Sequence, residues 1–295
     1  MNLISYTLFE PKRLFQHRNG WDKYNTLDRY WYNIPAVVCA NKILYPNFNI
    51  KIHISPNIKN HKFYKLLEKL KNDFGVLIEV IDRDYNKTEP TVWRYKPLLE
   101  KECDVILCRD IDSIPTADEV LSTYYFLENE SIKISTMRSH YAHAGPPTIM
   151  MAGLCSFKVN EVNPKISFNQ LLEMSSNSEW GVDQEFLIKT FTSDKEWNKK
   201  HFLDCRLSNR EHKVCGPAIE CISLDYNHFR KNIRFNDFGI ESDILPLLNE
   251  YVVWAGEPVD IRKDKLKNIL KLNYDFCEKM LFFIENNEDL KEFYL

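Results

Sequence analysis

The first third of the chain alternates strand-like and helix-like patterns, and this alternation constrains the fold more than any other feature. Strands are predicted over residues 3–9, 50–55, 76–81 and 104–108, with helices between them over residues 29–44, 61–74 and 91–100. Strands separated by helices are typical of an α/β fold, a Rossmann-like and mainly parallel sheet with helices on both faces. Such sheets bind ligands beyond the carboxyl ends of their strands.

The pattern becomes less regular from residue 116 onward. Helices are predicted over 117–127, 167–174 and 182–191, strands over 133–137, 149–157 and 219–224, and a loop rich in His, Gly and Pro over 139–147. Long loops on an α/β scaffold usually select substrates. We therefore expect one domain over residues 1–240, in which residues 1–113 bind a donor and residues 114–240 an acceptor. Residues 241–295 are predicted to form a helical C-terminal extension packed on this domain.

Composition excludes several classes of protein. With 39 basic and 42 acidic residues among 295, the net charge of −3 argues against a nucleic-acid partner. The longest apolar run, residues 34–40, is far shorter than the roughly 18 residues that span a bilayer. The eight cysteines form no Cys-x-x-Cys pair, which favours buried thiols and a cytoplasmic location.

The C-terminal tail leaves one question about membranes open. A basic stretch at residues 262–267 leads into an amphipathic tail with an apolar stripe. Such a tail can make a weak peripheral contact with an anionic membrane. The default interpretation is that the stripe packs on the domain, because most such stripes are part of a core.

The fourth predicted strand leads into Arg109, Asp110, Ile111, Asp112 and Ser113. Two carboxylates at i and i+2 at a strand end can converge on one hard cation through oxygen ligands. The sequence therefore predicts a site for Mn²⁺ or Mg²⁺ at Asp110 and Asp112. The alternative is that these carboxylates cap the next helix or solvate a loop.

Three further residues are candidates for ligand contact. His140 and His143 lie in the Gly- and Pro-containing loop, which we expect to contact a sugar or phosphate group of the acceptor side; a metal site and simple structural hydrogen bonding are the alternatives. Gly153 stands in an apolar run, where a missing side chain indicates close approach by a ligand or another chain segment, or a tight bend.

Several motifs occur here in the same order as in a known group of enzymes: Trp93-Arg94, the RDIDS segment 109–113, the segment 137–143, Met151-Ala-Gly153 and Asp183-Gln184. Over about residues 28–190, the chain resembles glycosyltransferases of the GT-A fold. More narrowly, it resembles a group of sugar transferases from microbes, algae and large viruses. It departs from that group's pattern at Ser139 and at Cys155-Ser156.

The resemblance implies roles on the donor side. Asp110 and Asp112 would hold the Mn²⁺ or Mg²⁺ that bridges the two phosphates of a nucleotide sugar, and Arg94 and Gly153 would contact the donor. A late histidine, His228, would be a third metal ligand. The alternatives are an ordinary helix-surface arginine at position 94 and a surface or capping histidine at position 228.

The resemblance also implies a catalytic pair. Asp183 and Gln184 would lie at the reacting face of the sugar; alternatively, they only occupy the first turn of a helix. The predicted function is a metal-dependent glycosyltransferase that moves a sugar from a nucleotide-diphosphate sugar to a hydroxyl of a glycan or glycoconjugate. The alternatives are a non-catalytic nucleotide-sugar or carbohydrate-binding protein and a phosphatase of the haloacid-dehalogenase type.

Overall fold

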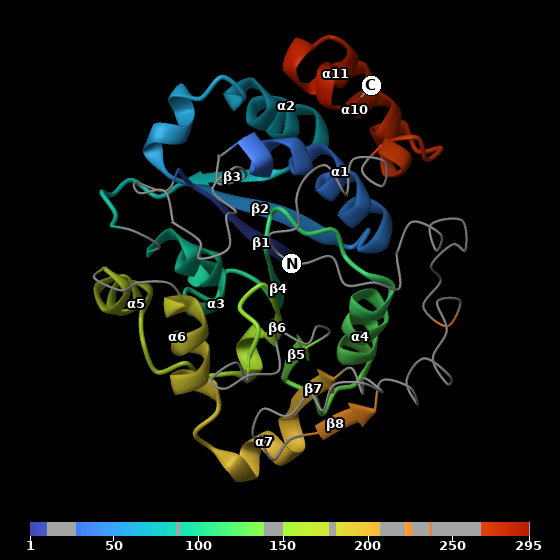
Figure 1. Cartoon of the computed structure of the whole chain (residues 1–295). Helices are drawn as coiled ribbons and strands as arrows, with labels where there is room; N and C mark the ends of the chain where they lie inside the picture. Colours follow the sequence, from blue (N-terminus) through green and yellow to red (C-terminus); the bar gives the residue numbers. More distant parts are fainter. Residues whose placement is uncertain are drawn as a thin grey trace, which may run out of the picture.

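A computed structural model describes residues 1–10, 28–86, 89–138, 150–176, 181–206, 222–225, 237 and 267–294. Within these ranges, the strands form a single sheet in the order β3-β2-β1-β4-β6-β5-β7-β8 (Figure 1). The strands are β1 Asn2–Leu8, β2 Phe48–Ile54, β3 Leu77–Val80, β4 Val105–Arg109, β5 Ile134–Arg138, β6 Leu154–Lys158, β7 Phe202–Arg206 and β8 Ile222–Asp225. All pairings are parallel except those of β6, which runs antiparallel to both β4 and β5. The predicted mainly parallel α/β sheet is confirmed.

Helices connect these strands and cover both faces of the sheet. The α-helices are α1 Asp28–Leu44, α2 Tyr64–Phe74, α3 Lys96–Leu99, α4 Ala117–Glu128, α5 Phe168–Ser175, α6 Val182–Phe191, α7 Lys195–His201, α10 Asp275–Glu285 and α11 Glu288–Tyr294. The 3₁₀ helices η2 Pro56–Asn60, η3 Glu89–Tyr95 and η5 Val159–Glu161 also lie within the described ranges.

The central strands contribute side chains to two separate cores, because successive side chains of a strand point to opposite faces of the sheet. In β4, Leu107 packs in the core under α1 and α2, whereas Ile106 and Cys108 pack in the core under η3, α5 and α6. In β1, Leu3 belongs to the second core and Tyr6 to the first. Both faces of β1 and β4 are therefore buried, which explains why these segments are apolar without strict alternation.

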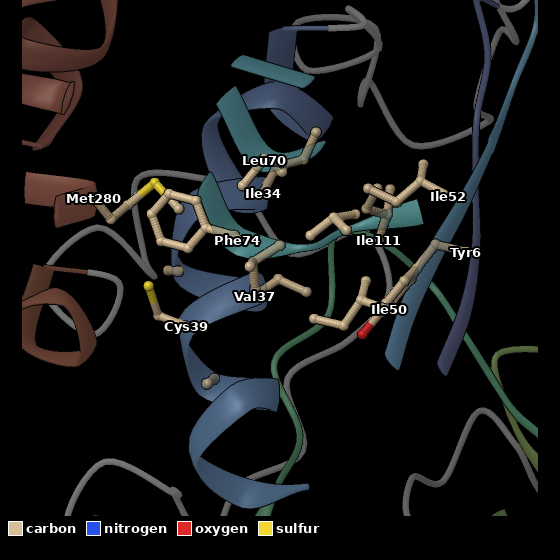
Figure 2. Packing of buried hydrophobic residues seen from close by; sticks show 14 of the residues in the cluster. Tyr6, Ile34, Val37, Cys39, Ile50, Ile52, Leu70, Phe74, Ile111 and Met280 are labelled. Carbon is tan, nitrogen blue, oxygen red and sulfur yellow. The ribbon is translucent and has the colours of Figure 1, made fainter. Parts of the chain in front are cut away.

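The first core is layered from the sheet through α1 and α2 to the C-terminal helices (Figure 2). Ile50 and Ile52 of β2 lie on the sheet side, and Met280 of α10 lies on the far side of α1. The stripe predicted in the tail faces this core, since Cys277, Met280 and Ile284 are buried. The apolar stripe is thus occupied by contacts within the chain.

Three local predictions differ from the structure. No element is predicted over residues 195–206, but this segment forms α7 and β7, and His201 is the last residue of α7. The strand predicted over 149–157 begins only at Leu154, because the chain turns at 151–154, where the Leu154 amide donates to the Met151 carbonyl at 3.0 Å. The helix predicted over 91–100 is mostly 3₁₀, and only Lys96–Leu99 is α-helical.

The described ranges contain no disulfide and no helix that could span a membrane. The cysteines there, Cys39, Cys103, Cys108, Cys155, Cys205 and Cys277, are all free and buried, as expected for small core residues. Among the helices that the structure describes, none is both long and apolar enough to cross a lipid bilayer.

A buried histidine lies beneath a charged cluster on β2 and β3. His53 Nε2 is 3.2 Å from Ser5 Oγ, and His53 Nδ1 is 3.3 Å from Glu79 Oε2. Glu79 also pairs with Lys96 of α3 at 2.8 Å. Burial lowers the pKa of His53 below its usual value of 6.5, although the Glu79 carboxylate acts in the opposite direction. His53 is therefore neutral in the folded protein at neutral pH.

We expect the free energy of unfolding to fall as pH is lowered from about 7.5 to about 5.5. The unfolded chain protonates His53 near pH 6.5, whereas the folded chain resists protonation, so acid favours unfolding. The measurement is urea unfolding at both pH values for the wild type and for His53→Gln, which should lose less stability across this interval. An equal loss in both proteins would assign the pH dependence to other groups.

Candidate functional site

Arg94 is the centre of a cluster at the carboxyl end of β4. It lies on η3, and its side chain is only 7% exposed. Its Nε donates to the Thr91 carbonyl at 2.9 Å, which holds the guanidinium against its own helix. Nη1 donates to Asp110 Oδ1 at 2.5 Å, and Nη2 donates to Asp183 Oδ2 at 3.4 Å. One guanidinium therefore connects the acidic motif after β4 with the first turn of α6.

Burial lowers the pKa of Arg94, but Asp110, Tyr95 and Asp183 together raise it well above its usual range. The guanidinium is thus permanently charged in this environment. Because Arg94 is buried and paired with two carboxylates, the alternative of an ordinary helix-surface arginine is wrong.

Asp110 is held between Arg94 and Gly153. One carboxylate oxygen accepts from Arg94, and the other faces the Cα of Gly153, where a Cβ would overlap the carboxylate. The antiparallel pairing of β4 with β6 explains this contact. Arg109 is paired with Leu154 at the end of the ladder, and Asp110 and Gly153 are the next residues of the two segments. Gly153 thus serves close approach by another segment of this chain, one of the alternatives considered from sequence.

The acidic motif turns directly after the strand. The Ser113 amide donates to the Asp110 carbonyl at 3.1 Å, and Ile111 points into the core under α1 and α2. Asp112 is buried, whereas the Asp110 side chain is 32% exposed. Asp110 is therefore the more accessible carboxylate of the pair.

Asp183 is the second residue of α6 and lies in its first turn. The helix is preceded by Gly181, whose positive φ of 92° suits a residue without a side chain. Asp183 Oδ1 accepts from the backbone amide of Gln184 at 2.9 Å, and Oδ2 accepts from Arg94. Burial raises the pKa of Asp183, while Arg94 acts to lower it. Asp183 thus makes both the helix-start contact and a contact to the cluster, and Gln184 follows it on the same turn.

Arg109, inside the same motif, has a structural role that sequence analysis did not assign. Its guanidinium is buried and pairs with Glu119 in the first turn of α4. It also donates to the Cys155 carbonyl at 2.9 Å and to Thr123 Oγ1 at 3.3 Å. These bonds tie the end of β4 to β6 and α4. A charged residue at the end of a buried strand signals such a partner, because unpaired buried charges are costly.

A second buried arginine ties β5 to β7. Arg138 Nε donates to Asp204 Oδ1 at 3.1 Å, and Arg138 Nη2 donates to Asp204 Oδ2, so the pair is bidentate. Both side chains are almost completely buried. Arg138 is the last described residue before the range 139–149, which contains His140 and His143. This pair could not be predicted, because no strand was expected over residues 202–206.

Three predicted site residues lie outside the described residues. His140, His143 and His228 belong to the ranges 139–149 and 226–236, and their predicted roles remain predictions. Within the described ranges, no cluster of three or more His, Cys, Asp or Glu side chains is arranged to hold a metal ion.

The donor chemistry of the acidic motif nevertheless suits Mn²⁺ or Mg²⁺. Magnesium is usually held by one or two carboxylates together with waters and substrate phosphates, so a complete protein cage is not required. The partly exposed carboxylate of Asp110 offers oxygen ligands of this kind, and Asp112 follows in the same turn. Asp110 is therefore the carboxylate of the motif that is open to a cation, and the metal role of the buried Asp112 remains a prediction.

Comparisons with known proteins find only weak structural similarity. No protein-family model matches the chain, and no curated protein does. Among solved structures, S. aureus TarS 1–349 in complex with UDP-GlcNAc is 10% identical with a TM-score of 0.40, covering 100% of this chain and 90% of that chain. The glycosyltransferase GlyE of Streptococcus pneumoniae TIGR4 is 13% identical with a TM-score of 0.42, covering 97% of this chain and 64% of that chain. At these values, the likeness assigns neither a family nor an activity.

Gly153→Ala should lower the free energy of unfolding by about 1–3 kcal/mol, because the added Cβ meets the Asp110 carboxylate. The loss should be smaller by at least about 1 kcal/mol in an Asp110→Ala background, where that carboxylate is absent. Urea unfolding of both single variants and the double variant measures this coupling. Strict additivity would show that the two residues do not oppose each other.

Glu119→Gln should lower the free energy of unfolding by about 3–5 kcal/mol, because it leaves the Arg109 charge buried without its carboxylate. Glu161→Gln is the matched control, since Glu161 pairs with Lys133 at the surface and should cost less than about 1 kcal/mol. Urea unfolding compares the two variants. If Glu119→Gln lowered the free energy of unfolding no more than the control does, the Arg109–Glu119 pair would not stabilise the site.

Proposed function

We propose that this protein is a metal-dependent glycosyltransferase that moves a sugar from a nucleotide-diphosphate sugar to a hydroxyl of a glycan or glycoconjugate. The observation that carries the proposal is the Arg94 bridge. It joins Asp110, at the carboxyl end of a central strand, to Asp183, at the start of α6. These three residues belong to the motifs by which the sequence resembles GT-A glycosyltransferases.

The position of the cluster supports a nucleotide-sugar donor. Parallel α/β sheets bind ligands beyond the carboxyl ends of their strands, and Asp110 follows the last residue of β4 there. Breaking a glycosidic bond to a nucleoside diphosphate leaves negative charge on the diphosphate. A cation held by Asp110 and Asp112 would supply Lewis-acid stabilisation of that leaving group.

The protein's own residues have distinct proposed roles. Arg94 orients Asp183 and contributes positive charge beside the donor. Asp183, buried next to that guanidinium, either positions sugar or acceptor hydroxyls or accepts a proton from the acceptor hydroxyl, with Gln184 beside it. Gly153 leaves the space in which the Asp110 carboxylate lies. The roles proposed for His140, His143 and His228 rest on the sequence alone.

A screen of nucleotide-diphosphate sugars with Mn²⁺ tests the proposal, with thermal stabilisation and release of nucleoside diphosphate as the two readouts. Stabilisation and release by the same nucleotide sugar support a transferase. Stabilisation without release, even with a pool of glycan acceptors, favours a binding protein. Phosphate release from a simple phosphomonoester favours the phosphatase alternative. No effect of any nucleotide sugar contradicts the proposal.

Asp110→Asn and Asp183→Asn should each lower turnover by about 10²-fold or more, because each removes a charge that the reaction uses. The exposed neighbour Glu185, on the same helix as Asp183, pairs with Lys189, and Glu185→Gln is the control with nearly normal turnover. Initial rates with the donor identified by the screen, together with melting temperatures, are the measurements. Normal turnover in Asp183→Asn would assign that residue to the helix start alone.

A further inference from the structure

The guanidinium of Arg94 lies beside the Asp110 carboxylate, where a cation bound to Asp110 would also lie. Its Nη1 is 2.5 Å from Asp110 Oδ1 and 3.3 Å from the Arg109 carbonyl. The other carboxylate oxygen, Oδ2, faces the backbone of Gly153. Since metal–oxygen bonds of Mg²⁺ are about 2.1 Å long, a cation on Oδ1 lies within about 5 Å of the guanidinium. Two positive groups therefore meet at one carboxylate.

The guanidinium cannot leave the site entirely, even when it gives up Asp110. Its Nε is bonded to the Thr91 carbonyl, its Nη2 contacts Asp183 of α6, and the side chain is buried. Its charge is fixed, because arginine is not deprotonated in proteins. Counting the bridged groups, Asp110 and Asp183 carry −2 and Arg94 carries +1, so the cluster has a net charge of −1. Without the arginine charge, the same cluster would carry −2.

The second arm of Arg94 gives the guanidinium another partner. Nη2 already lies 3.4 Å from Asp183 Oδ2, a longer contact than the one to Asp110. If a cation bound to Asp110, the guanidinium would still have Asp183 as a carboxylate partner. The Arg94 bridge would therefore couple cation binding at Asp110 to the contact between Arg94 and Asp183.

We propose that Arg94 competes with the divalent cation for Asp110. In the metal-free protein, Arg94 holds the Asp110 carboxylate; cation binding releases Arg94 from Asp110 and leaves it paired with Asp183. This inference rests on the proposed function, because it takes Asp110 as a cation ligand. It assigns to Arg94 a role in limiting cation affinity, in addition to its contact with the donor.

The test is calorimetric titration of the protein with Mn²⁺ alone. Arg94→Gln should bind Mn²⁺ about tenfold more tightly than the wild type, because a neighbouring positive charge is removed. Arg94→Lys, which keeps the charge, should stay within about threefold of the wild type. Asp110→Asn should bind Mn²⁺ at least about tenfold more weakly. Unchanged or weaker binding by Arg94→Gln overturns the proposal.

The Asp110→Asn variant separates the two possible failures. If its Mn²⁺ affinity is reduced but that of Arg94→Gln is unchanged, only the competition is wrong. If Asp110→Asn binds Mn²⁺ like the wild type, or if no variant binds it, the metal assignment fails and the competition fails with it. A nucleotide-sugar screen that succeeds without metal would then leave the transferase proposal standing.

A measurement on the wild type decides the matter where Arg94→Gln does not fold. Side-chain ¹⁵N NMR of arginine, with Arg94 assigned from Arg94→Lys, follows its guanidinium while Mg²⁺ is added. A change in the Arg94 signals that saturates with Mg²⁺ supports the competition. Arg94 signals that stay constant while Mg²⁺ binds overturn it.

Discussion

Two carboxylates brought together inside a protein need a cation between them, and here the cation is the guanidinium of Arg94. Asp110 comes from the end of β4 and Asp183 from the start of α6. Neither segment pairs with the other in the sheet. The Arg94 bridge is therefore what brings the acidic motif and the helix start into one site, and the burial of Arg94 fixes its geometry.

The rest of the structure keeps this bridge in place. Trp93 and Tyr95, on either side of Arg94, are fully buried, and the Tyr95 hydroxyl donates to the Ala152 carbonyl at 3.1 Å. This bond fixes the turn that precedes Gly153, which in turn borders Asp110. On the other face of the sheet, Ile111 anchors the acidic motif in the first core. The buried apolar residues on either side of Arg94 and between Asp110 and Asp112 thus hold these charged side chains in place.

Much of the fold could be predicted because its signals are local. The strand predicted at 104–108 and the helix predicted at 182–191 correspond closely to β4 and α6, since long apolar runs and helical spacing depend little on distant partners. β7 could not be predicted in this way, although it is as long as β4. Its central Asp204 is a poor strand residue until Arg138 of the neighbouring strand neutralises it.

The site shows the same division between local and distant information. The Asp-Ile-Asp motif and the need for a glycine at 153 are visible in the sequence, but which groups meet there is not. Arg94 could equally have been a surface arginine, because its two carboxylate partners lie on separate elements. The pairing of Arg109 with Glu119 was likewise hidden, since a charged residue in a motif is readily interpreted as part of the chemistry.

The buried arginines Arg94, Arg109 and Arg138 differ in the exposure of their carboxylate partners. Arg109 and Arg138 have carboxylate partners that are themselves buried, and these ion pairs join strands and helices. Arg94 is different, because one of its partners, Asp110, is partly exposed. A fully enclosed pair can only hold structure, whereas a partly exposed carboxylate can exchange its partner for a ligand at modest cost. This difference in exposure distinguishes Asp110, which can exchange its partner for a ligand, from Arg109, which supports the acidic segment.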